Sequence, residues 1–278
     1  MKVKLDFPPH LKYLNMGYYI MENILENPFY YLNDKEKDLL SRYSDDIIKF
    51  KNKEIITIID LGAGNGKKLY NLILKCINIY NKVTYIPIDT SYDSIQICIK
   101  TYSSITSNKF KINPIVGDYY KLLNLNIKGN CLIFFLGSTI GNYDKKTAKE
   151  LLSKLIIPES RFICMFDSPP NENKSINDII KAYDIPEMKL IDNNMLKVIQ
   201  DENRYMRYEN FVRNINYDLS INALIRSFES ENYIFRTEIS YKYSINDIND
   251  LIYNTSVKIK KTWKTFDNYY MVEFYNYL

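Results

Sequence analysis

Histidine is almost absent from this sequence, in which the single example is His10, beside two prolines. Hydrolases with a Ser-His-Asp triad and enzymes with histidine-held metals need histidine at the reacting centre. One histidine nearly excludes both classes, and we expect no metal site. The only four cysteines are widely spaced within apolar segments: Cys76, Cys98, Cys131 and Cys164. Because this spacing matches neither a zinc site nor a disulfide framework, we expect buried free thiols.

Long apolar runs and concentrated charge are also missing. The sequence has no run of roughly 18 apolar residues and no signal-peptide pattern, so we expect a cytoplasmic protein without a membrane partner. The net charge of +4 comes from lysines scattered among acids. Such charge is typical of a solvated surface, so we expect no nucleic-acid partner. A chain of 278 residues can bury one large core or two modest ones, and we expect a monomer or weak dimer.

A glycine motif follows a predicted strand near residue 60. Residues 55–61 are rich in β-branched side chains, which favours a strand, and Gly62, Gly64 and Gly66 come next. Glycine lets the backbone approach a ligand closely. Residues 67–80 then show the apolar spacing of a helix. A strand, a glycine turn and a helix together predict a nucleotide-binding unit.

Acidic residues follow the next two predicted strands. Residues 82–89 form a strand that ends in Asp89, about 20 residues beyond the glycines, where an acid would meet the ribose of a nucleotide. Residues 112–116 form a third strand, followed by Asp118 and Tyr119. A dehydrogenase would share the first two signals but has no reason for the third. The spacing is that of class I methyltransferases, which bind S-adenosylmethionine.

A small-residue loop follows the fourth predicted strand. Residues 132–142 read as a short apolar strand that runs into Gly137-Ser-Thr-Ile-Gly-Asn142. Ligands of parallel sheets sit beyond the carboxyl ends of the strands. Asn142 would offer a donor and an acceptor there. For Gly141-Asn142 alone, an ordinary loop with no ligand is an equally good interpretation.

A second short motif suggests a different substrate. Asp167-Ser-Pro-Pro170 resembles the signature with which amino-methylating DNA enzymes hold a flipped base. That signature belongs at the end of the fourth strand, whereas here it follows the fifth, at residues 161–167. No basic channel accompanies it. We therefore interpret the prolines as a turn between domains.

The order of predicted elements indicates an α/β fold with a doubly wound sheet and a smaller α+β domain. Alternating strands and helices occupy residues 35–167, and residues 257–277 read as an antiparallel hairpin that closes the sheet. We expect a cofactor-binding domain of residues 35–172 and 241–278. Residues 1–34 and 173–240 would form a substrate-binding domain, packed together as a lid over the crevice.

Three motifs carry a family resemblance. Phe135-Leu-Gly-Ser-Thr-Ile-Gly-Asn142 resembles the signature of the histidine-specific methyltransferases, which use S-adenosylmethionine to trimethylate the α-amino group of histidine in ergothioneine biosynthesis. The resemblance extends to the amino-terminal part, with Pro8, Pro9, Tyr13, Gly17 and Asn27–Tyr31. It resumes at Thr237-Glu-Ile-Ser240 with Lys242, so it covers nearly the whole chain. It implies a class I methyltransferase Rossmann-like fold with a smaller substrate-binding domain.

The resemblance also implies roles for single residues. Gly62 and Gly64 would line the methionine and ribose of the cofactor, Asp89 would bind the ribose, and Asp118 and Tyr119 would flank the adenine. On the substrate side, Asn142 and Tyr30 would hold the reacting amino acid group. Further substrate contacts would come from four residues: Tyr13, Tyr183, Glu238 and Ser240. Glu238 and Ser240 would bind an imidazole, and a strand places such i and i+2 residues on one face.

The sequence departs from the family pattern in ways that leave the substrate open. The segment between Phe211 and Glu238 is shorter, and residues 222–226 place a small Ala223 near a pocket-lining position. The glycine motif opens with Asp60 and carries Asn65, where the family commonly has Glu and a hydroxyl residue. Relatives with this fold methylate a prenylated tryptophan. We therefore expect an N-methyltransferase of histidine or a related amino acid, with an aromatic amine methyltransferase or a non-catalytic cofactor-binding subunit as alternatives.

Overall fold

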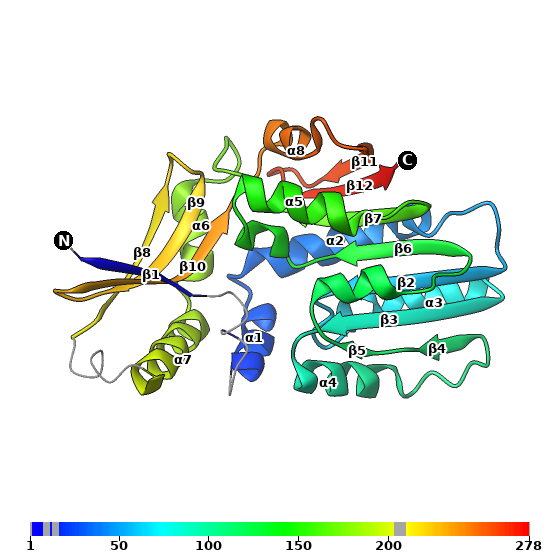
Figure 1. The fold of residues 1–278 in the computed structure, drawn as a ribbon, viewed down its shortest axis with the longest axis horizontal. Coiled ribbons are helices and arrows are strands. Elements are labelled where there is room, and N and C mark those ends of the chain that lie inside the picture. Colours follow the sequence, from blue (N-terminus) through cyan, green and yellow to red (C-terminus); the bar gives the residue numbers. More distant parts are fainter. Residues whose placement is uncertain (1, 8–11, 13–16, 203–209, 278) are drawn as a thin grey trace.

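The computed structural model describes residues 2–7, 12, 17–202 and 210–277, which fold around two β-sheets (Figure 1). Tyr13, Pro8 and Pro9, which belong to the expected substrate side, lie outside the described residues. Within the described ranges, no helix is long and apolar enough to cross a membrane. All four cysteines are buried and unpaired, as expected from their spacing.

The larger sheet has the strand order β11-β12-β7-β6-β2-β3-β4, with β5 also paired to β3. Its strands are β2 (Ile55–Leu61), β3 (Lys82–Asp89), β4 (Phe110–Ile112), β5 (Ile115–Val116), β6 (Asn130–Phe135), β7 (Ser160–Phe166), β11 (Val257–Lys264) and β12 (Tyr270–Asn276). The strands from β7 to β4 run parallel to one another, and β12 is antiparallel to both of its neighbours, β7 and β11. This arrangement confirms the predicted class I methyltransferase fold with its closing hairpin.

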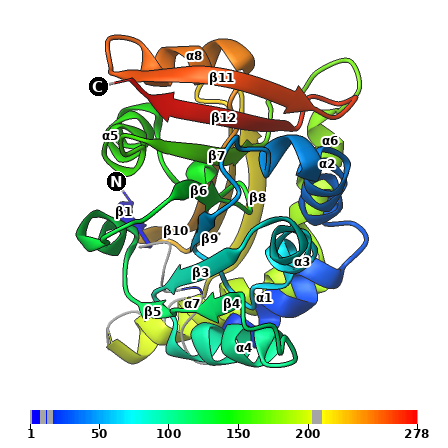
Figure 2. The same ribbon diagram turned by 90° about the vertical axis from the view of Figure 1, so that its right-hand side faces the viewer.

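Helices cover both faces of this sheet (Figure 2). One apolar core lies under α2 (Tyr31–Ile47), α3 (Tyr70–Ile79) and α4 (Tyr92–Tyr102). A second core lies on the opposite face, under α5 (Lys145–Leu155), α8 (Ile245–Ile252) and the 3₁₀ helix η3 (Tyr119–Asn124). Because both faces are covered, the central strands are buried along nearly their whole length, which explains their continuous apolar sequences.

Two predicted elements differ in detail. The third strand, expected over residues 112–116, is split into β4 and β5 on either side of Asn113 and Pro114. Proline has no backbone N–H to donate to a neighbouring strand, so pairing is interrupted there. The helix expected to begin at Lys67 starts as a 3₁₀ turn, η2 (Lys67–Leu69), and continues as α3.

The smaller sheet joins the two distant parts of the chain that we expected to form one domain. Its order is β1-β10-β9-β8, built from β1 (Val3–Asp6), β8 (Val212–Asp218), β9 (Ala223–Glu229) and β10 (Tyr233–Tyr241). Strand β1 runs parallel to β10. Three helices lie beside this sheet: α1 (Gly17–Glu26), α6 (Ile176–Tyr183) and α7 (Pro186–Glu202). Helix α1 packs on α7. The expected boundary between residues 34 and 35 falls inside α2.

Candidate active site

The glycine turn lies at the carboxyl end of β2 and is hydrogen-bonded to the end of β3. Gly62, Gly64 and Gly66 have φ angles of 75°, 54° and 72°, a region that other residues rarely adopt. The Gly64 N–H donates to Asp89 Oδ2 at 2.9 Å. The Gly62 N–H donates to the Ile88 carbonyl at 2.8 Å. The turn is therefore held open beside the Asp89 carboxylate.

Asp89 is partly buried, and its carboxylate accepts hydrogen bonds from backbone N–H groups. Its Oδ1 accepts from the Ser91 N–H at 2.9 Å, while its Oδ2 accepts from Gly64. Burial raises the pKa of Asp89, and these backbone donors oppose the rise. A carboxylate has about four lone-pair sites, so two bonds leave it able to accept two more. Such a group suits a pair of neighbouring hydroxyls.

An aromatic ring faces the glycine turn from the end of the next strand. Asp118 caps η3, its Oδ1 accepting from the Tyr120 N–H at 3.0 Å. A side-chain carbon placed on Gly62 would lie 3.6 Å from the Tyr119 ring. Tyr119 also packs edge-on against Phe135, with ring centroids 5.0 Å apart. A side chain at this position would therefore touch the ring, and the positive φ angle of Gly62 also favours glycine.

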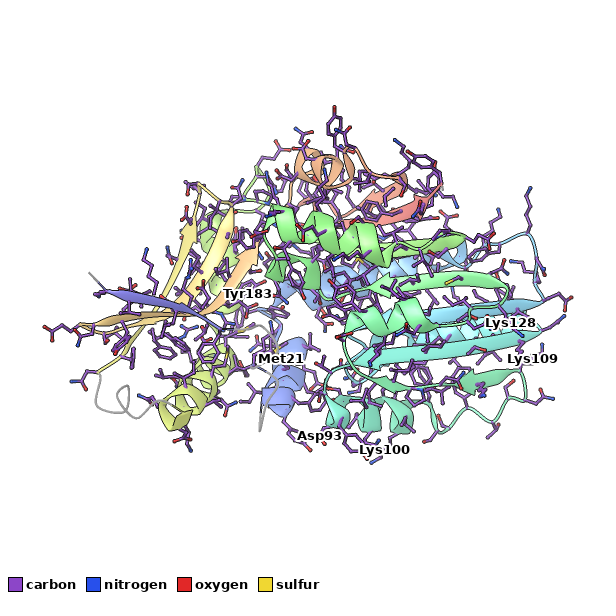
Figure 3. The ribbon with its side chains drawn as sticks, viewed as in Figure 1. Met21, Asp93, Lys100, Lys109, Lys128 and Tyr183 are labelled. Carbon is purple, nitrogen blue, oxygen red and sulfur yellow. The ribbon has the colours of Figure 1, made fainter. Side chains whose placement is uncertain are left out.

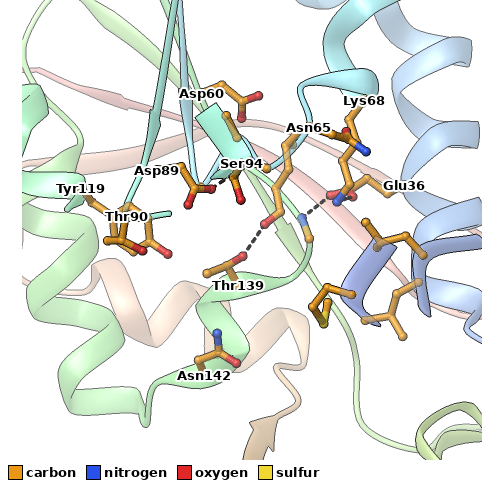
Figure 4. Close-up of a pocket in the computed structure, with 18 of the residues that line it drawn as sticks. Glu36, Asp60, Asn65, Lys68, Asp89, Thr90, Ser94, Tyr119, Thr139 and Asn142 are labelled. Carbon is orange, nitrogen blue, oxygen red and sulfur yellow. Dashed lines mark hydrogen bonds and ion pairs between the residues drawn. The ribbon is translucent and has the colours of Figure 1, made fainter. Parts of the chain in front are cut away.

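One cavity of about 570 Å³ joins these elements to the substrate side. This volume lies within the usual range for small-molecule sites. In Figure 4, Asp89 and Tyr119 lie on one side, Glu36 and Lys68 on the other, and Asn142 at the far end. The cavity brings together seven of the predicted site residues: Tyr30, Gly62, Gly64, Asp89, Asp118, Tyr119 and Asn142.

The cavity carries an excess of negative charge. Its described lining contains one basic side chain, Lys68, and six acids: Glu22, Glu36, Asp60, Asp89, Asp118 and Glu150. Burial raises the pKa of Asp60 to about 7, although the Tyr85 hydroxyl donates to it at 2.9 Å and Lys68 lies nearby. Surplus carboxylates in a confined space attract a cation. This acidic lining thus complements a positively charged cofactor such as a sulfonium.

Glu36 and Lys68 are pocket residues that sequence reasoning missed. Glu36 is 1% exposed, forms an ion pair with Lys68, and accepts from the Gly137 N–H at 2.6 Å. It therefore links α2, the 3₁₀ helix η2 and the loop after β6. The available signal was its position on the apolar face of α2, between Leu32 and Leu39. A charged residue in a buried stripe needs a partner, which is a reason to suspect a site.

Asn142 ends the 3₁₀ helix η4 (Thr139–Asn142), which follows the β6 loop. Its side-chain amide lines the cavity and makes no hydrogen bond to another described residue. Gly141 lies against β10, where a side-chain carbon would meet the Tyr241 carbonyl oxygen at 2.9 Å. Glycine at this position lets η4 pack closely on β10. The Asn142 amide is therefore available to a ligand at the junction of the two sheets.

Tyr183, Ser240 and Glu238 belong to the smaller sheet and its helices, and they are outside the lining of this cavity. Tyr183 faces the junction (Figure 3), and its ring centroid lies 5.7 Å from that of Tyr30. Its hydroxyl lies 3.3 Å from Ser240 Oγ. This group therefore packs against the cavity wall through Tyr30, which lines the cavity.

Glu238 forms ion pairs with two basic side chains of the protein. Its Oε1 lies 3.2 Å from Lys12 Nζ, and its Oε2 lies 2.5 Å from an Arg226 nitrogen. Burial alone would raise the pKa of Glu238, but Lys12 and Arg226 together lower it to about 2. Arg226 also pairs with Asp192 at 2.9 Å. The carboxylate is thus ionised, and its charge is balanced within the protein.

The family model described as histidine-specific methyltransferase, SAM-dependent, matches residues 2–221. The N-methyltransferase dtpB of Aspergillus flavus is 24% identical over 160 residues, which are 54% of this chain and 44% of that protein. Ergothioneine biosynthesis protein 1 of Neurospora crassa is 28% identical over 154 residues, which are 53% of this chain and 17% of that protein. The chain thus matches less than half the length of these two relatives.

A solved structure has the same fold. Magnesium protoporphyrin IX methyltransferase from Synechocystis PCC 6803, with bound SAH, aligns with a TM-score of 0.51 and 11% identity, covering 95% of this chain and 94% of that one. At this identity the likeness concerns the fold alone. The family match over most of the sequence goes further, and the chain belongs to the SAM-dependent, histidine-specific methyltransferase family.

Proposed function

We propose that this protein transfers a methyl group from S-adenosylmethionine to the amino group of a small amino acid or related amine. The observation that carries the proposal is a single cavity that runs from the glycine turn and Asp89 to Tyr30 and Asn142. A methyl donor at one end and an amine at the other would meet without crossing bulk water. Family membership supports the choice of cofactor.

The residues present suit the cofactor. Gly62 and Gly64 would border its methionine and ribose, Asp89 would accept from the ribose hydroxyls, and the Tyr119 ring would pack on the adenine beside Asp118. When bound, S-adenosylmethionine supplies an electrophilic methyl group on a positively charged sulfur. The acid-rich lining would stabilise that positive charge.

On the substrate side, the protein mainly positions an amine. Asn142 would hold the amino acid group with its free amide, and Tyr30 would pack beside it. A free α-amino group has a pKa of about 8, so part of it is already in the nucleophilic neutral form near neutral pH, without a dedicated base. Desolvation and a neighbouring sulfonium would lower this pKa, whereas the carboxylates of the lining would raise it. Tyrosine rings in the lining would stabilise the growing positive charge through cation–π contact. Positioning then supplies most of the catalysis.

Within this class, we propose histidine as the first candidate substrate, acting through its α-amino group. Support comes from the family description and from the proximity of Tyr183 and Ser240 to Tyr30. The second candidate is an aromatic, tryptophan-derived amine. It is favoured by the ion pairs of Glu238, because a carboxylate already balanced by Lys12 and Arg226 is less demanding of an imidazole N–H.

We further propose that the smaller sheet, with α1, α6 and α7, is the substrate-binding unit. Its β1 strand pairs with β10, and β10 lies against η4, which carries Asn142. The smaller unit therefore lies against the element that carries Asn142, and its helix α1 contributes Tyr18 and Glu22 to the cavity lining. A non-catalytic cofactor-binding subunit would have no use for a free amide at this junction.

A methylation assay with a substrate panel tests the proposed function. Purified protein would be incubated with S-adenosylmethionine and, separately, L-histidine, L-tryptophan, a prenylated tryptophan, histamine and tryptamine, with product masses read by mass spectrometry. We expect a methylated product from at least one amine, and the preferred amine decides between histidine and an aromatic substrate. Cofactor binding without turnover of any panel member would favour the non-catalytic alternative.

Replacing Asp89 should weaken cofactor binding. In Asp89→Ala, the Gly64 and Ser91 N–H groups lose their acceptor and the ribose loses its partner. We expect the dissociation constant for S-adenosylmethionine to rise by about tenfold to a hundredfold, measured by calorimetry. Asp93→Ala is the matched control, because Asp93 is exposed on the next helix and lies outside the cavity. Equal affinities for wild type and Asp89→Ala would contradict the cofactor site.

A further inference from the structure

A buried carboxylate at the end of β7 holds two lysines. Asp167 accepts from the Tyr31 hydroxyl at 2.7 Å, from Lys174 Nζ at 2.5 Å and from Lys242 Nζ at 2.8 Å. Asp167, Lys174 and Lys242 are each 2% exposed. Two ammonium groups share one carboxylate, so the cluster retains one positive charge. It lies where the larger sheet, α2 and the residue after β10 meet.

The three N–H donors of Lys242 can all be assigned. Besides Asp167, its Nζ donates to the Tyr183 hydroxyl and to Ser240 Oγ, both at 3.1 Å. An ammonium group has three donors and no acceptor, so the direction of all three bonds is fixed. Both hydroxyl oxygens therefore receive a hydrogen bond from Lys242. Lys174 pairs with the same Asp167 but has no recorded bond to either hydroxyl.

This assignment leaves one hydroxyl hydrogen over. Tyr183 and Ser240 lie 3.3 Å apart, so one hydroxyl can donate to the other. Each hydroxyl carries a single hydrogen. The second hydrogen has no acceptor among the residues that the structure describes. A buried donor without an acceptor is costly, which indicates that a group from elsewhere accepts this bond.

The spare donor borders the substrate end of the cavity. The Tyr183 ring packs edge-on against Tyr30, which lines the cavity. Ser240 Oγ would lie 3.7 Å from a side-chain carbon at Gly141, the neighbour of Asn142. A substrate held by Tyr30 and Asn142 is therefore the nearest candidate for the missing acceptor.

We propose that Lys242, held by Asp167, is a positioning residue that makes the Tyr183–Ser240 pair a hydrogen-bond donor to the substrate. The substrate group bound there is consequently an acceptor, either a carboxylate oxygen or an unprotonated ring nitrogen, and not an N–H. The residual positive charge of the cluster complements such an electron-rich group. This inference rests on the proposed function, because it requires that an amine substrate occupies this end of the cavity.

A matched pair of variants tests the role of Lys242. Lys242→Met and Lys174→Met each leave Asp167 with one ammonium group and the Tyr31 hydroxyl, so both remove the same charge from the same carboxylate. Only Lys242→Met removes the donor from both hydroxyls. We expect Lys242→Met to raise KM for the amine substrate by about tenfold or more, with a smaller change in kcat. Lys174→Met should keep KM within about threefold of wild type. The dissociation constant for S-adenosylmethionine should stay unchanged in both.

Two further variants separate positioning from folding. Lys242→Gln retains N–H donors without the charge, and should recover part of the affinity that Lys242→Met loses. Ser240→Ala removes a member of the hydroxyl pair, and should raise KM without touching Asp167. If Lys242 acts through the pair, the double variant Lys242→Met/Ser240→Ala should be far less than additive.

The substrate panel identifies which acceptor is bound. If the acceptor is a carboxylate, Lys242→Met should raise KM for L-histidine and L-tryptophan but not for histamine. If it is a ring nitrogen, the KM values for L-histidine and histamine should rise, and that for L-tryptophan should not. Equal KM changes in Lys242→Met and Lys174→Met, or additive effects with Ser240→Ala, would overturn the inference while the proposed function stands. A wild-type protein that methylates no panel member overturns both.

Discussion

Asn142→Ala is expected to lower kcat/KM by about a hundredfold for every amino acid that the wild-type protein methylates. The Asn142 amide lines the cavity and makes no hydrogen bond to another described residue, so it is available to bind a ligand. Removing a donor that orients the reacting group typically costs a factor of about a hundred to a thousand. Because the glycine turn and Asp89 are untouched, the affinity for S-adenosylmethionine should not change.

The comparison with Asn142→Asp shows whether the amide donates or accepts. Aspartate keeps the shape and both acceptor sites but loses the N–H donors. If Asn142 donates to a substrate carboxylate, the kcat/KM of Asn142→Asp should be at least as low as that of Asn142→Ala, because two negative groups would then face each other. Steady-state kinetics with each active panel substrate gives kcat/KM for both variants. A kcat/KM for Asn142→Ala within about threefold of wild type would remove Asn142 from the site.

The largest expected effect on folding follows from Asp167→Ala. This substitution leaves Lys174 and Lys242 buried without their shared carboxylate. Breaking a buried ion pair from one side typically costs about 3–5 kcal/mol, because the remaining charge is uncompensated. We expect the free energy of unfolding to fall by that amount in urea titrations at pH 7. Asp93→Ala, at an exposed site, should change it by less than about 0.5 kcal/mol.

The same carboxylate predicts an acid-sensitive fold. Burial raises the pKa of Asp167, but Lys242 and Lys174 lower it more, so the net value lies well below that of a free aspartate. A carboxyl group with a depressed folded-state pKa stabilises the protein above its unfolded pKa of about 4 and loses that contribution as the pH falls further. Unfolding measured between pH 7 and pH 2 should show this loss in wild type. The free energy of unfolding of Asp167→Asn should fall less steeply as the pH is lowered. Parallel pH curves for wild type and Asp167→Asn would contradict the depressed pKa of Asp167.

Local sequence signals were enough to predict which residues meet at the glycine-turn end of the cavity. Gly62 and Gly64 follow a β-branched strand, and Asp89 ends the next one, so their meeting follows from the parallel pairing of β2 with β3. The same reasoning placed Asn142 at the end of β6, beside β2. Parallel strands bring their carboxyl ends to one edge, which makes such residues predictable from spacing alone.

The partners of buried charges were not predictable in this way. Glu238 pairs with Lys12, 226 positions away, and Asp167 pairs with Lys242, 75 positions away. No periodicity within one element indicates which distant cation will reach a carboxylate. Nothing in Asp167-Ser-Pro-Pro170 itself indicates that its carboxylate pairs with two buried lysines. The Glu36–Lys68 pair was missed for the same reason, although Glu36 in an apolar stripe was a warning.

The position of the transferred methyl group shows most directly whether the cavity brings a sulfonium methyl group to the amino nitrogen of its substrate. The protein would be incubated with S-adenosylmethionine carrying a ¹³C-labelled methyl group and the amine that it prefers, and the product examined by NMR. We predict a labelled methyl signal with a through-bond correlation to the substrate's α-carbon, which places the methyl on the amino nitrogen. A methyl group on a ring atom or on an oxygen, or no labelled product from any amine of the panel, would contradict the account.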